Sequence, residues 1–455
     1  MNKPSSLLIV LFIISIFSLE SKEPSMLTVP LKVLHNSFEK FPISNETHLI
    51  YEKKEKVQTF LGEKSRTLIE EKHGIVKKLD CLLFAAEITI GRSQTFYVIL
   101  DTGSANLWVA GINSNDTSEI QRHYDPSKSS TKAETSETFE LEYGTGETKG
   151  VYYTDLISFI TPETHDIKFG VASQTNFNAD GADGIMGLAR HYSDRQFSKI
   201  WMMAAKNIIS SKSFSFKYIS DDNVDMFLGD EHSDFKQENN TVQCKLLNGG
   251  TYQDLFWTCR LYQFGLYSKK DISRNATTNC GYPFLFDTGS NIMMLPLETL
   301  KQLTNDLSRF NCSKYKDPED ESYKIVCFDK ENLPNFMIEV GDHFILLDSD
   351  EMYNILKDDN GNYEYIFNIA FQENFPIALI GQPFFKLFHT KFDYENKVLK
   401  FYSEDESKFI FTSIKPDEKE PISWTKIGIA VAVAFAGLLI LCCICRCIRK
   451  MFCIK

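Results

Sequence analysis

The chain has 455 residues, of which 43% are hydrophobic and 13% aromatic, and its formal net charge is −12. This length exceeds what one ordinary core holds, so we expect two lobes with terminal appendages. The acidic balance argues against a nucleic-acid partner, because a phosphate backbone requires a basic surface. The high aromatic content favours strand-rich packing.

The first appendage begins with Lys3 and an apolar run over residues 7–17, followed by small polar residues. This order is typical of a secretory signal peptide, so we predict one over residues 1–21, with an uncleaved anchor as the alternative. Residues 22–78 are rich in Lys and Glu and contain one strand-like piece at 27–34. We interpret residues 22–78 as a pro-segment.

Residues 79–412 have the pattern of a mainly β region. Short alternating or wholly apolar runs are separated by Gly, Asn, Asp and Pro, as expected of strands joined by turns. Strands are predicted at residues 85–90, 96–100, 139–143, 156–159, 214–219, 284–286 and 397–402. Helical patterns are few and short, at residues 197–205, 297–307 and 351–357.

The sequence Asp-Thr-Gly-Ser occurs twice, beginning at Asp101 and at Asp287, each time after an apolar run. An apolar-apolar-Gly segment follows each copy and ends at Gly187 and Gly381, 86 and 94 residues after the respective aspartate. One Asp-Thr-Gly is weak evidence, because Asp and Gly are common turn residues. The repeated order, however, predicts two pseudo-symmetric lobes.

The two predicted lobes, residues 79–220 and 221–412, would bring the two aspartates together at a cleft. Two carboxyl groups held close together cannot both ionise cheaply, so one keeps its proton while the other stays charged. The pair then offers an acid and a base, which is the combination that general acid–base hydrolysis requires.

Four segments occur in a consistent order along the chain. They are Asp101-Thr-Gly-Ser-Ala-Asn-Leu-Trp-Val109, Tyr143-Gly-Thr-Gly146, the closing stretch at residues 379–393, and Val29-Pro-Leu-Lys32 in the pro-segment. Together they resemble the markers of pepsin-like aspartic endopeptidases, and the resemblance covers residues 79–412. It implies a mainly β, bilobal fold with two pseudo-symmetric lobes and a cleft between them.

The resemblance also implies a role for each motif residue. Asp101 and Asp287 would be the catalytic pair that shares a water molecule and a proton. The implied flap residues are Tyr143, Gly144 and Thr145, with the indole N–H of Trp108 holding the Tyr143 hydroxyl. In the motifs, threonines would tie the two loops together, serines would bond the outer carboxylate oxygens, and glycines would let the backbone turn tightly. These supporting residues are Thr102, Gly103, Ser104, Thr288, Gly289 and Ser290.

The chain departs from the family pattern at two places. Asn291 stands where the family more often has Ser or Thr, and residues 111–121 lack the family's common small disulfide loop. None of the nine histidines has the spacing of a ligand or a catalytic base. Neither Gly-x-Ser-x-Gly nor His-Glu-x-x-His occurs, which weighs against serine hydrolases and common zinc peptidases. We therefore expect neither a metal nor a cofactor.

Six cysteines precede the C-terminal region, an even number suited to an oxidising compartment. They are Cys81, Cys244, Cys259, Cys280, Cys312 and Cys327. Cys312 and Cys327 form the best local disulfide candidate, and the pairing of the other four stays open. Five Asn-x-Ser/Thr sequons, which fit surface loops of a secreted protein, begin at Asn45, Asn115, Asn239, Asn275 and Asn311.

The C-terminal region carries a predicted membrane anchor after a polar stalk at residues 413–426. Residues 427–445 are uncharged, and at ~1.5 Å per residue this segment can cross a ~30 Å hydrocarbon core. Four basic residues follow within residues 446–455, which predicts a cytosolic tail. A buried core helix is the alternative. The five cysteines of this region fit S-palmitoylation, a zinc site or small apolar filler.

These features predict an aspartic endopeptidase that is made as a zymogen and anchored by one membrane helix. We expect a monomer that acts on protein or peptide substrates. Its catalytic lobes would face the lumen of the secretory or endolysosomal pathway, or the cell exterior. The rival is a catalytically silent substrate-binding protein on the same scaffold, and the presence of both aspartates weighs against it.

Overall fold

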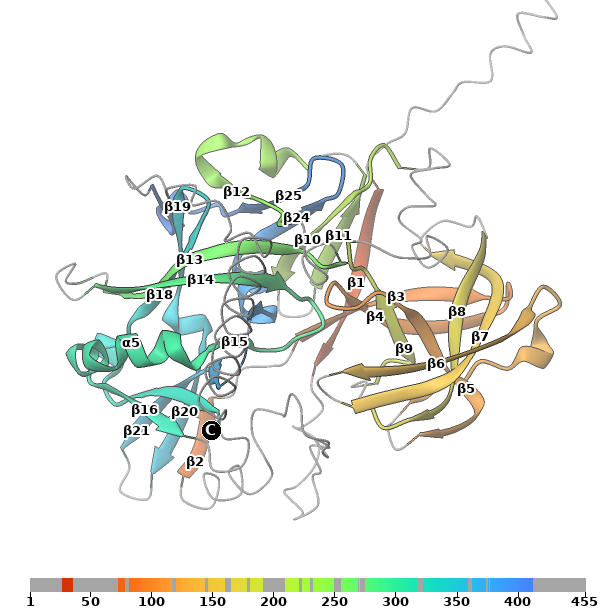
Figure 1. Ribbon diagram of the computed structural model, residues 1–455, viewed down its shortest axis with the longest axis horizontal. Helices are drawn as coiled ribbons and strands as arrows, with labels where there is room; N and C mark the ends of the chain where they lie inside the picture. Colours follow the sequence, from red (N-terminus) through yellow and green to blue (C-terminus); the bar gives the residue numbers. More distant parts are fainter. Residues whose placement is uncertain are drawn as a thin grey trace, which may run out of the picture. The chain divides into compact units, whose positions relative to one another are not determined.

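The computed structural model describes residues 27–35, 73–77, 82–116, 120–143, 146–159, 165–177, 181–190, 209–220, 223–229, 232–248, 255–268, 270, 275–316, 322–358, 362–373, 375 and 377–411. All of them belong to one unit, Met1–Phe411, drawn in colour in Figure 1. The second unit, Thr412–Lys455, lies outside the described residues, as do the predicted signal peptide and most of the pro-segment. Among the residues that the structure describes, no helix combines the length and apolar character of a membrane span.

The first sheet has thirteen strands in the order β12-β25-β24-β10-β11-β1-β3-β4-β9-β5-β8-β7-β6. An additional pairing between β3 and β7 closes the strands from β3 to β7 into a ring. The strands are β1 (Leu27–His35), β3 (Leu82–Ile90), β4 (Gln94–Asp101), β5 (Leu107–Asp116), β6 (Ala133–Tyr143), β7 (Gly146–Phe159), β8 (His165–Thr175), β9 (Gly184–Gly187), β10 (Ser213–Ser220), β11 (Asn223–Leu228), β12 (Thr241–Lys245), β24 (His389–Asp393) and β25 (Val398–Tyr402). Strands from both halves of the chain therefore share this sheet.

The second sheet runs β2-β20-β21-β17-β22-β15-β23-β14-β13-β18-β19-β26, and β16 pairs with β17 beside this path. Its strands are β2 (His73–Lys77), β13 (Thr258–Tyr267), β14 (Ala276–Phe286), β15 (Met293–Pro296), β16 (Cys312–Lys316), β17 (Tyr323–Cys327), β18 (Asn335–Val340), β19 (His343–Leu347), β20 (Tyr353–Asp358), β21 (Tyr363–Phe367), β22 (Ile369–Gln372), β23 (Ala378–Ile380) and β26 (Phe409–Phe411).

Helices are short in the described part of the chain. The α-helices are α5 (Leu297–Leu307), which packs against β14 and β16 (Figure 1), and α6 (Gln382–Leu387). The 3₁₀ turns are η2 (Pro126–Lys128), η4 (Ser233–Lys236), η5 (Glu238–Asn240), η7 (Ser308–Phe310), η8 (Lys330–Asn332), η9 (Ser349–Glu351) and η10 (Glu406–Lys408). This architecture confirms the predicted mainly β, bilobal fold.

Each Asp-Thr-Gly motif leaves a strand that has a parallel neighbour. Strand β4 pairs in parallel with β9, with Asp101 opposite Gly187, while β9 pairs antiparallel with β5. In the second lobe β14 pairs in parallel with β23, and β23 pairs antiparallel with β15. The apolar-apolar-Gly crossing predicted from the sequence repeat is therefore present in both lobes.

The end of β4, which carries the first motif, is buried on both faces. Val98 and Leu100 belong to the large core, whereas Ile99 faces a smaller core around Trp108. Because both faces are covered, this part of β4 is a continuous apolar run rather than a polar–apolar alternation. Burial on both sides fixes the end of β4 and therefore the position of the first motif.

Most predicted elements correspond to observed ones. Every predicted strand run lies within or overlaps an observed strand, and the helix predicted at residues 297–307 is α5. The predicted helix at 197–205 lies outside the described residues. The helix predicted at 351–357 was wrong, because η9 ends at Glu351 and β20 follows. Strand β20 pairs with both β2 and β21, and these long-range backbone hydrogen bonds outweigh a weak local helical pattern.

Two disulfides occur among the described cysteines. Cys312 lies opposite Cys327 in the β16–β17 pair and is bonded to it, and Cys244 is bonded to Cys259. Cys280 is a half-buried free thiol, and Cys81 lies outside the described residues. The structure thus contains the favoured local pair and joins two of the cysteines whose partners the sequence left open.

Candidate active site

The two motif loops are tied to each other by a reciprocal set of hydrogen bonds. The Thr102 N–H donates to Thr288 Oγ1 at 3.1 Å, and the Thr288 N–H donates to Thr102 Oγ1 at 2.9 Å. Each hydroxyl in turn donates to a carbonyl of the other lobe, Thr102 to Phe286 at 2.8 Å and Thr288 to Leu100 at 2.6 Å. Both threonines are completely buried. The four bonds fix one loop against the other.

The two carboxyl groups lie directly over the opposite motif's glycine. Each aspartate Oδ1 accepts a hydrogen bond from the glycine N–H of its own loop, Asp101 from Gly103 at 2.8 Å and Asp287 from Gly289 at 2.9 Å. A Cβ added at Gly103 would lie 2.5 Å from Asp287 Oδ1, and one at Gly289 would lie 2.5 Å from Asp101 Oδ1. Neither glycine has a positive φ. Glycine is needed here for close approach, and not for the tight turn expected from the sequence.

This packing favours the protonated form of Asp287. The pKa of Asp287 is well above its usual value, because burial removes it from water and because the negative charge of Asp101 and a hydrogen bond with it favour the protonated form. The backbone N–H groups of Gly289 and Gly103 oppose this rise in part. Asp287 therefore keeps a proton under conditions in which an isolated carboxyl group would have lost it.

The predicted flap tyrosine is held as the family resemblance implies. Trp108 Nε1 donates to the Tyr143 hydroxyl at 2.8 Å, and the Tyr143 ring lies 5.2 Å from the ring of Phe177. Burial and the charge of Asp101 raise the pKa of Tyr143 above its usual range. Tyr143 ends β6 opposite Gly146 at the start of β7. The other predicted flap residues, Gly144 and Thr145, lie outside the described residues.

The motif serines do not make the hydrogen bonds to the carboxylates that the family resemblance implies. Ser290 Oγ donates to the Ile292 carbonyl at 3.2 Å. Ser104 Oγ is buried near Tyr143, whose pKa it lowers, and has no partner within hydrogen-bond geometry among the described residues. No hydrogen bond from either serine to a carboxylate is present among these residues. The aspartates are instead held by backbone N–H groups.

Sequence reasoning missed two side chains that support the loops. Gln382 is 5% exposed and donates from Nε2 to the Thr288 carbonyl at 2.6 Å, while its backbone N–H donates to the Ser290 carbonyl at 2.8 Å. In the first lobe the Leu188 carbonyl accepts from Trp257 Nε1 at 2.7 Å. The available signal for Gln382 was a polar residue directly after Gly381 in an otherwise apolar run.

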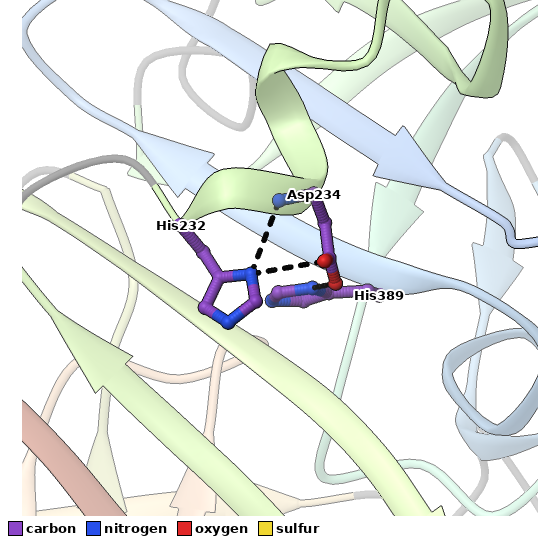
Figure 2. A group of neighbouring side chains, drawn as sticks. All are labelled: His232, Asp234 and His389. Carbon is purple, nitrogen blue, oxygen red and sulfur yellow. Dashed lines mark hydrogen bonds and ion pairs between the residues drawn. The ribbon is translucent and has the colours of Figure 1, made fainter.

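A second polar cluster consists of His232, Asp234 and His389 (Figure 2). Among the residues that the structure describes, it is the one group whose side chains could hold a metal ion. Its donor atoms are already engaged. His232 Nδ1 accepts from the Asp234 N–H at 3.2 Å, and Asp234 Oδ2 lies 2.9 Å from His389 Nδ1 and 2.7 Å from Lys217 Nζ. His389 Nε2 lies 2.9 Å from Ser215 Oγ. Because Lys217 already supplies the cation, we interpret this cluster as a hydrogen-bonded network that joins η4 to strands β10 and β24 of the first sheet.

The cluster's ionisation states follow from burial and pairing. Burial lowers the pKa of His389 from 6.5 to about 4, although Asp234 opposes this change. Burial alone would raise the pKa of Asp234, but hydrogen bonds from His389 and Lys217 lower it well below its usual value. At neutral pH the network therefore contains a neutral imidazole between a carboxylate and a hydroxyl.

A mainly β bilobal fold with two facing Asp-Thr-Gly loops defines a pepsin-like aspartic protease scaffold. The family model described as "Eukaryotic aspartyl protease" matches residues 83–403. Gastricsin of Oryctolagus cuniculus is 28% identical over 343 residues, covering 71% of this chain and 81% of that protein. Renin of Canis lupus familiaris is 25% identical over 349 residues, covering 70% of this chain and 78% of that protein. The chain belongs to the eukaryotic aspartyl protease family.

The depressed pKa of His389 predicts an acid-dependent loss of stability. Its stabilising contribution is complete above the unfolded value of 6.5 and is lost as the pH falls through about 4, because the unfolded chain then binds the proton more readily. The loss is on the order of 3 kcal/mol. In His389→Gln, the free energy of unfolding, measured with urea across this range, should decline less than in the wild type. His343→Gln, at a less buried position, serves as the control, and parallel curves for His389→Gln and wild type would contradict the linkage.

Proposed function

We propose that this protein is an aspartic endopeptidase in which Asp101 and Asp287 activate water to hydrolyse peptide bonds. The observation that carries this proposal is the facing pair of carboxyls, of which Asp287 has a strongly raised pKa. A proton donor and a charged proton acceptor then lie at one place. The lobes at residues 79–220 and 221–412 would each supply one of them.

The chemistry follows from this inequality. The charged carboxylate of Asp101 takes a proton from water as the water oxygen attacks the scissile carbonyl carbon. Protonated Asp287 gives its proton to the carbonyl oxygen, which yields a neutral diol. In the second step Asp101 passes its proton to the leaving nitrogen, a diol hydroxyl returns a proton to Asp287, and the C–N bond breaks. Each positioned group of this kind contributes about 10²–10⁴-fold to the rate.

The surrounding side chains fit supporting roles in this reaction. The Thr102–Thr288 bonds would keep the carboxyls at a constant separation through both steps. Tyr143, anchored by Trp108, would close over the substrate and exclude water. A catalytically silent binding protein is the rival function. Such a protein would not need a protonated carboxyl beside a charged one.

Latency is the second part of the proposal. Strand β1, within the proposed pro-segment at residues 22–78, pairs with β11 on one side and β3 on the other, and its Val29 and Leu31 are buried. Basic residues of the same segment, such as Lys53 or Lys54, would lie toward the carboxyls and keep both ionised at neutral pH. Neither lysine is among the described residues.

Membrane anchoring is the third part, and it rests on sequence. Residues 427–445 are uncharged and are followed by a basic tail at 446–455, whereas all five sequons lie before the span. We propose a single-pass, type I arrangement in which a stalk at 413–426 joins the span to a monomeric catalytic region. The catalytic region would then act in the lumen or outside the cell.

Asparagine at either aspartate should remove activity while preserving the fold, because one charged and one protonated carboxyl are both required. Asp101→Asn and Asp287→Asn should each lower kcat/KM on a peptide library by about 10²–10⁴-fold or more. Thermal unfolding checks that both variants fold, and Asp342→Asn at an exposed position should retain full activity. Full cleavage by either dyad variant would refute the assigned dyad.

Acid should convert the protein to a shorter, active form. Protonation of carboxylates weakens their pairs with the pro-segment's basic residues, so the segment is released as the pH falls. N-terminal sequencing after acid incubation should find a new terminus between about Arg66 and Leu79, within or near β2. The Asp287→Asn protein should keep its original terminus if cleavage is self-catalysed. Full activity at neutral pH with the segment uncut would exclude this form of latency.

The proposed topology predicts that a protease added outside sealed microsomes reaches the C-terminal tail but not the catalytic region. In sealed microsomes, protease should remove a C-terminal tag while the catalytic region stays protected, and alkaline carbonate should leave the protein in the membrane pellet. A chain ending at residue 412 should instead partition into the soluble fraction. A protected C-terminal tag, or extraction of the full chain by carbonate, would rule out the anchor.

A further inference from the structure

One peptide group links a buried side chain to an active-site carboxyl. The carbonyl of the Thr288–Gly289 peptide accepts from Gln382 Nε2 at 2.6 Å, and the N–H of the same peptide donates to Asp287 Oδ1 at 2.9 Å. Gln382 is the first residue of α6, and its own N–H donates to the Ser290 carbonyl at 2.8 Å. Gln382 therefore holds the motif loop at two carbonyls, one through its side chain and one through its backbone N–H.

Among the described residues of the first lobe, no side chain donates to the Thr102 carbonyl, the counterpart of the Thr288 carbonyl. There the Gly103 N–H donates to Asp101 Oδ1 at 2.8 Å in the same way. The residue after Gly187 is Leu188, however, whereas the residue after Gly381 is Gln382. A leucine side chain cannot donate a hydrogen bond to the carbonyl of the first motif loop. Among their described contacts, the two loops thus differ in a polar contact that reaches a carboxyl.

We propose that Gln382 is a positioning residue that moderates the raised pKa of Asp287, and so keeps it an effective acid, by polarising the peptide that binds its carboxyl. Donation to a carbonyl strengthens the N–H of the same amide as a donor. Gln382 thereby strengthens the bond from the Gly289 N–H to Asp287 Oδ1. This inference rests on the proposed function, which it deepens.

The consequence for proton transfer has a definite sign. A hydrogen bond to the carboxylate favours its charged form, so it counteracts burial and the charge of Asp101 at Asp287. Without Gln382, Asp287 would hold its proton more tightly and would be a weaker acid toward the substrate carbonyl. The apparent midpoint of Asp287 titration should then rise by roughly 0.5 pH unit, and kcat at the optimum should fall about two- to fivefold.

Two substitutions remove the donor in different ways. Gln382→Met keeps the length of the side chain, and Gln382→Leu reproduces the residue at the matching place in the first lobe. Gln94→Met is the matched control, because Gln94 Nε2 donates to the Asp125 carbonyl at 3.1 Å and so also holds a loop, but not one that carries an aspartate of the pair. Thermal unfolding identifies which variants fold, and two independent variants keep the test decisive.

The primary measurement is the titration of the Asp287 side chain by ¹³C NMR of the full chain with labelled aspartate, with the signal assigned from Asp287→Asn. The midpoint should rise in both Gln382 variants and stay at the wild-type position in Gln94→Met. The alkaline limb of the kcat profile should move in the same direction, with KM changed by less than about twofold. An unchanged midpoint in a folded Gln382 variant would overturn the inference, even if activity fell. Absence of peptide cleavage by the wild type would refute the proposed function alone, because the titration does not depend on turnover.

Discussion

The reciprocal hydrogen bonds between Thr102 and Thr288 are the constraint on which the rest of the site depends. Each hydroxyl both accepts a backbone N–H and donates to a backbone carbonyl across the lobe boundary. Loss of one hydroxyl would leave buried backbone groups without partners, at a cost of about 1–3 kcal/mol for each group. Because these bonds cross between lobes, the separation of the two carboxyls does not depend on the packing of either lobe alone.

This enforced closeness explains the composition of the motifs. Only glycine leaves room for the opposite carboxyl, since a Cβ at Gly103 or Gly289 would come within 2.5 Å of it. Burial and the nearby charge of Asp101 make a second negative charge expensive, so that Asp287 retains its proton. The steric fit and the raised pKa therefore both depend on this packing. The catalytic inequality that we propose therefore arises on a nearly symmetric scaffold.

The fold and the aspartate pair were predictable because their signals are local and repeated. Apolar runs marked the strands, and the duplicated motifs with their following glycines marked the lobes. Strand β20 was not predictable, because its partners β2 and β21 decide its conformation. Gln382 was missed for a similar reason, since its amide reaches a carbonyl 94 residues earlier in the chain. A glutamine at the start of a helix is ordinary until its partner is known.

Two polar networks among the described residues, around Asp234 and around Asp287, differ in a way that separates structure from chemistry. Around Asp234, an ammonium group and an imidazole satisfy the carboxylate, so its charge and its proton balance are fixed at neutral pH. Around Asp287, the strongest influences are burial and a second carboxyl, offset only in part by two backbone N–H groups. A carboxyl held by a cation has little tendency to exchange protons. One held against another carboxyl has a proton that is easily shared, and this is the property that an attacking water requires.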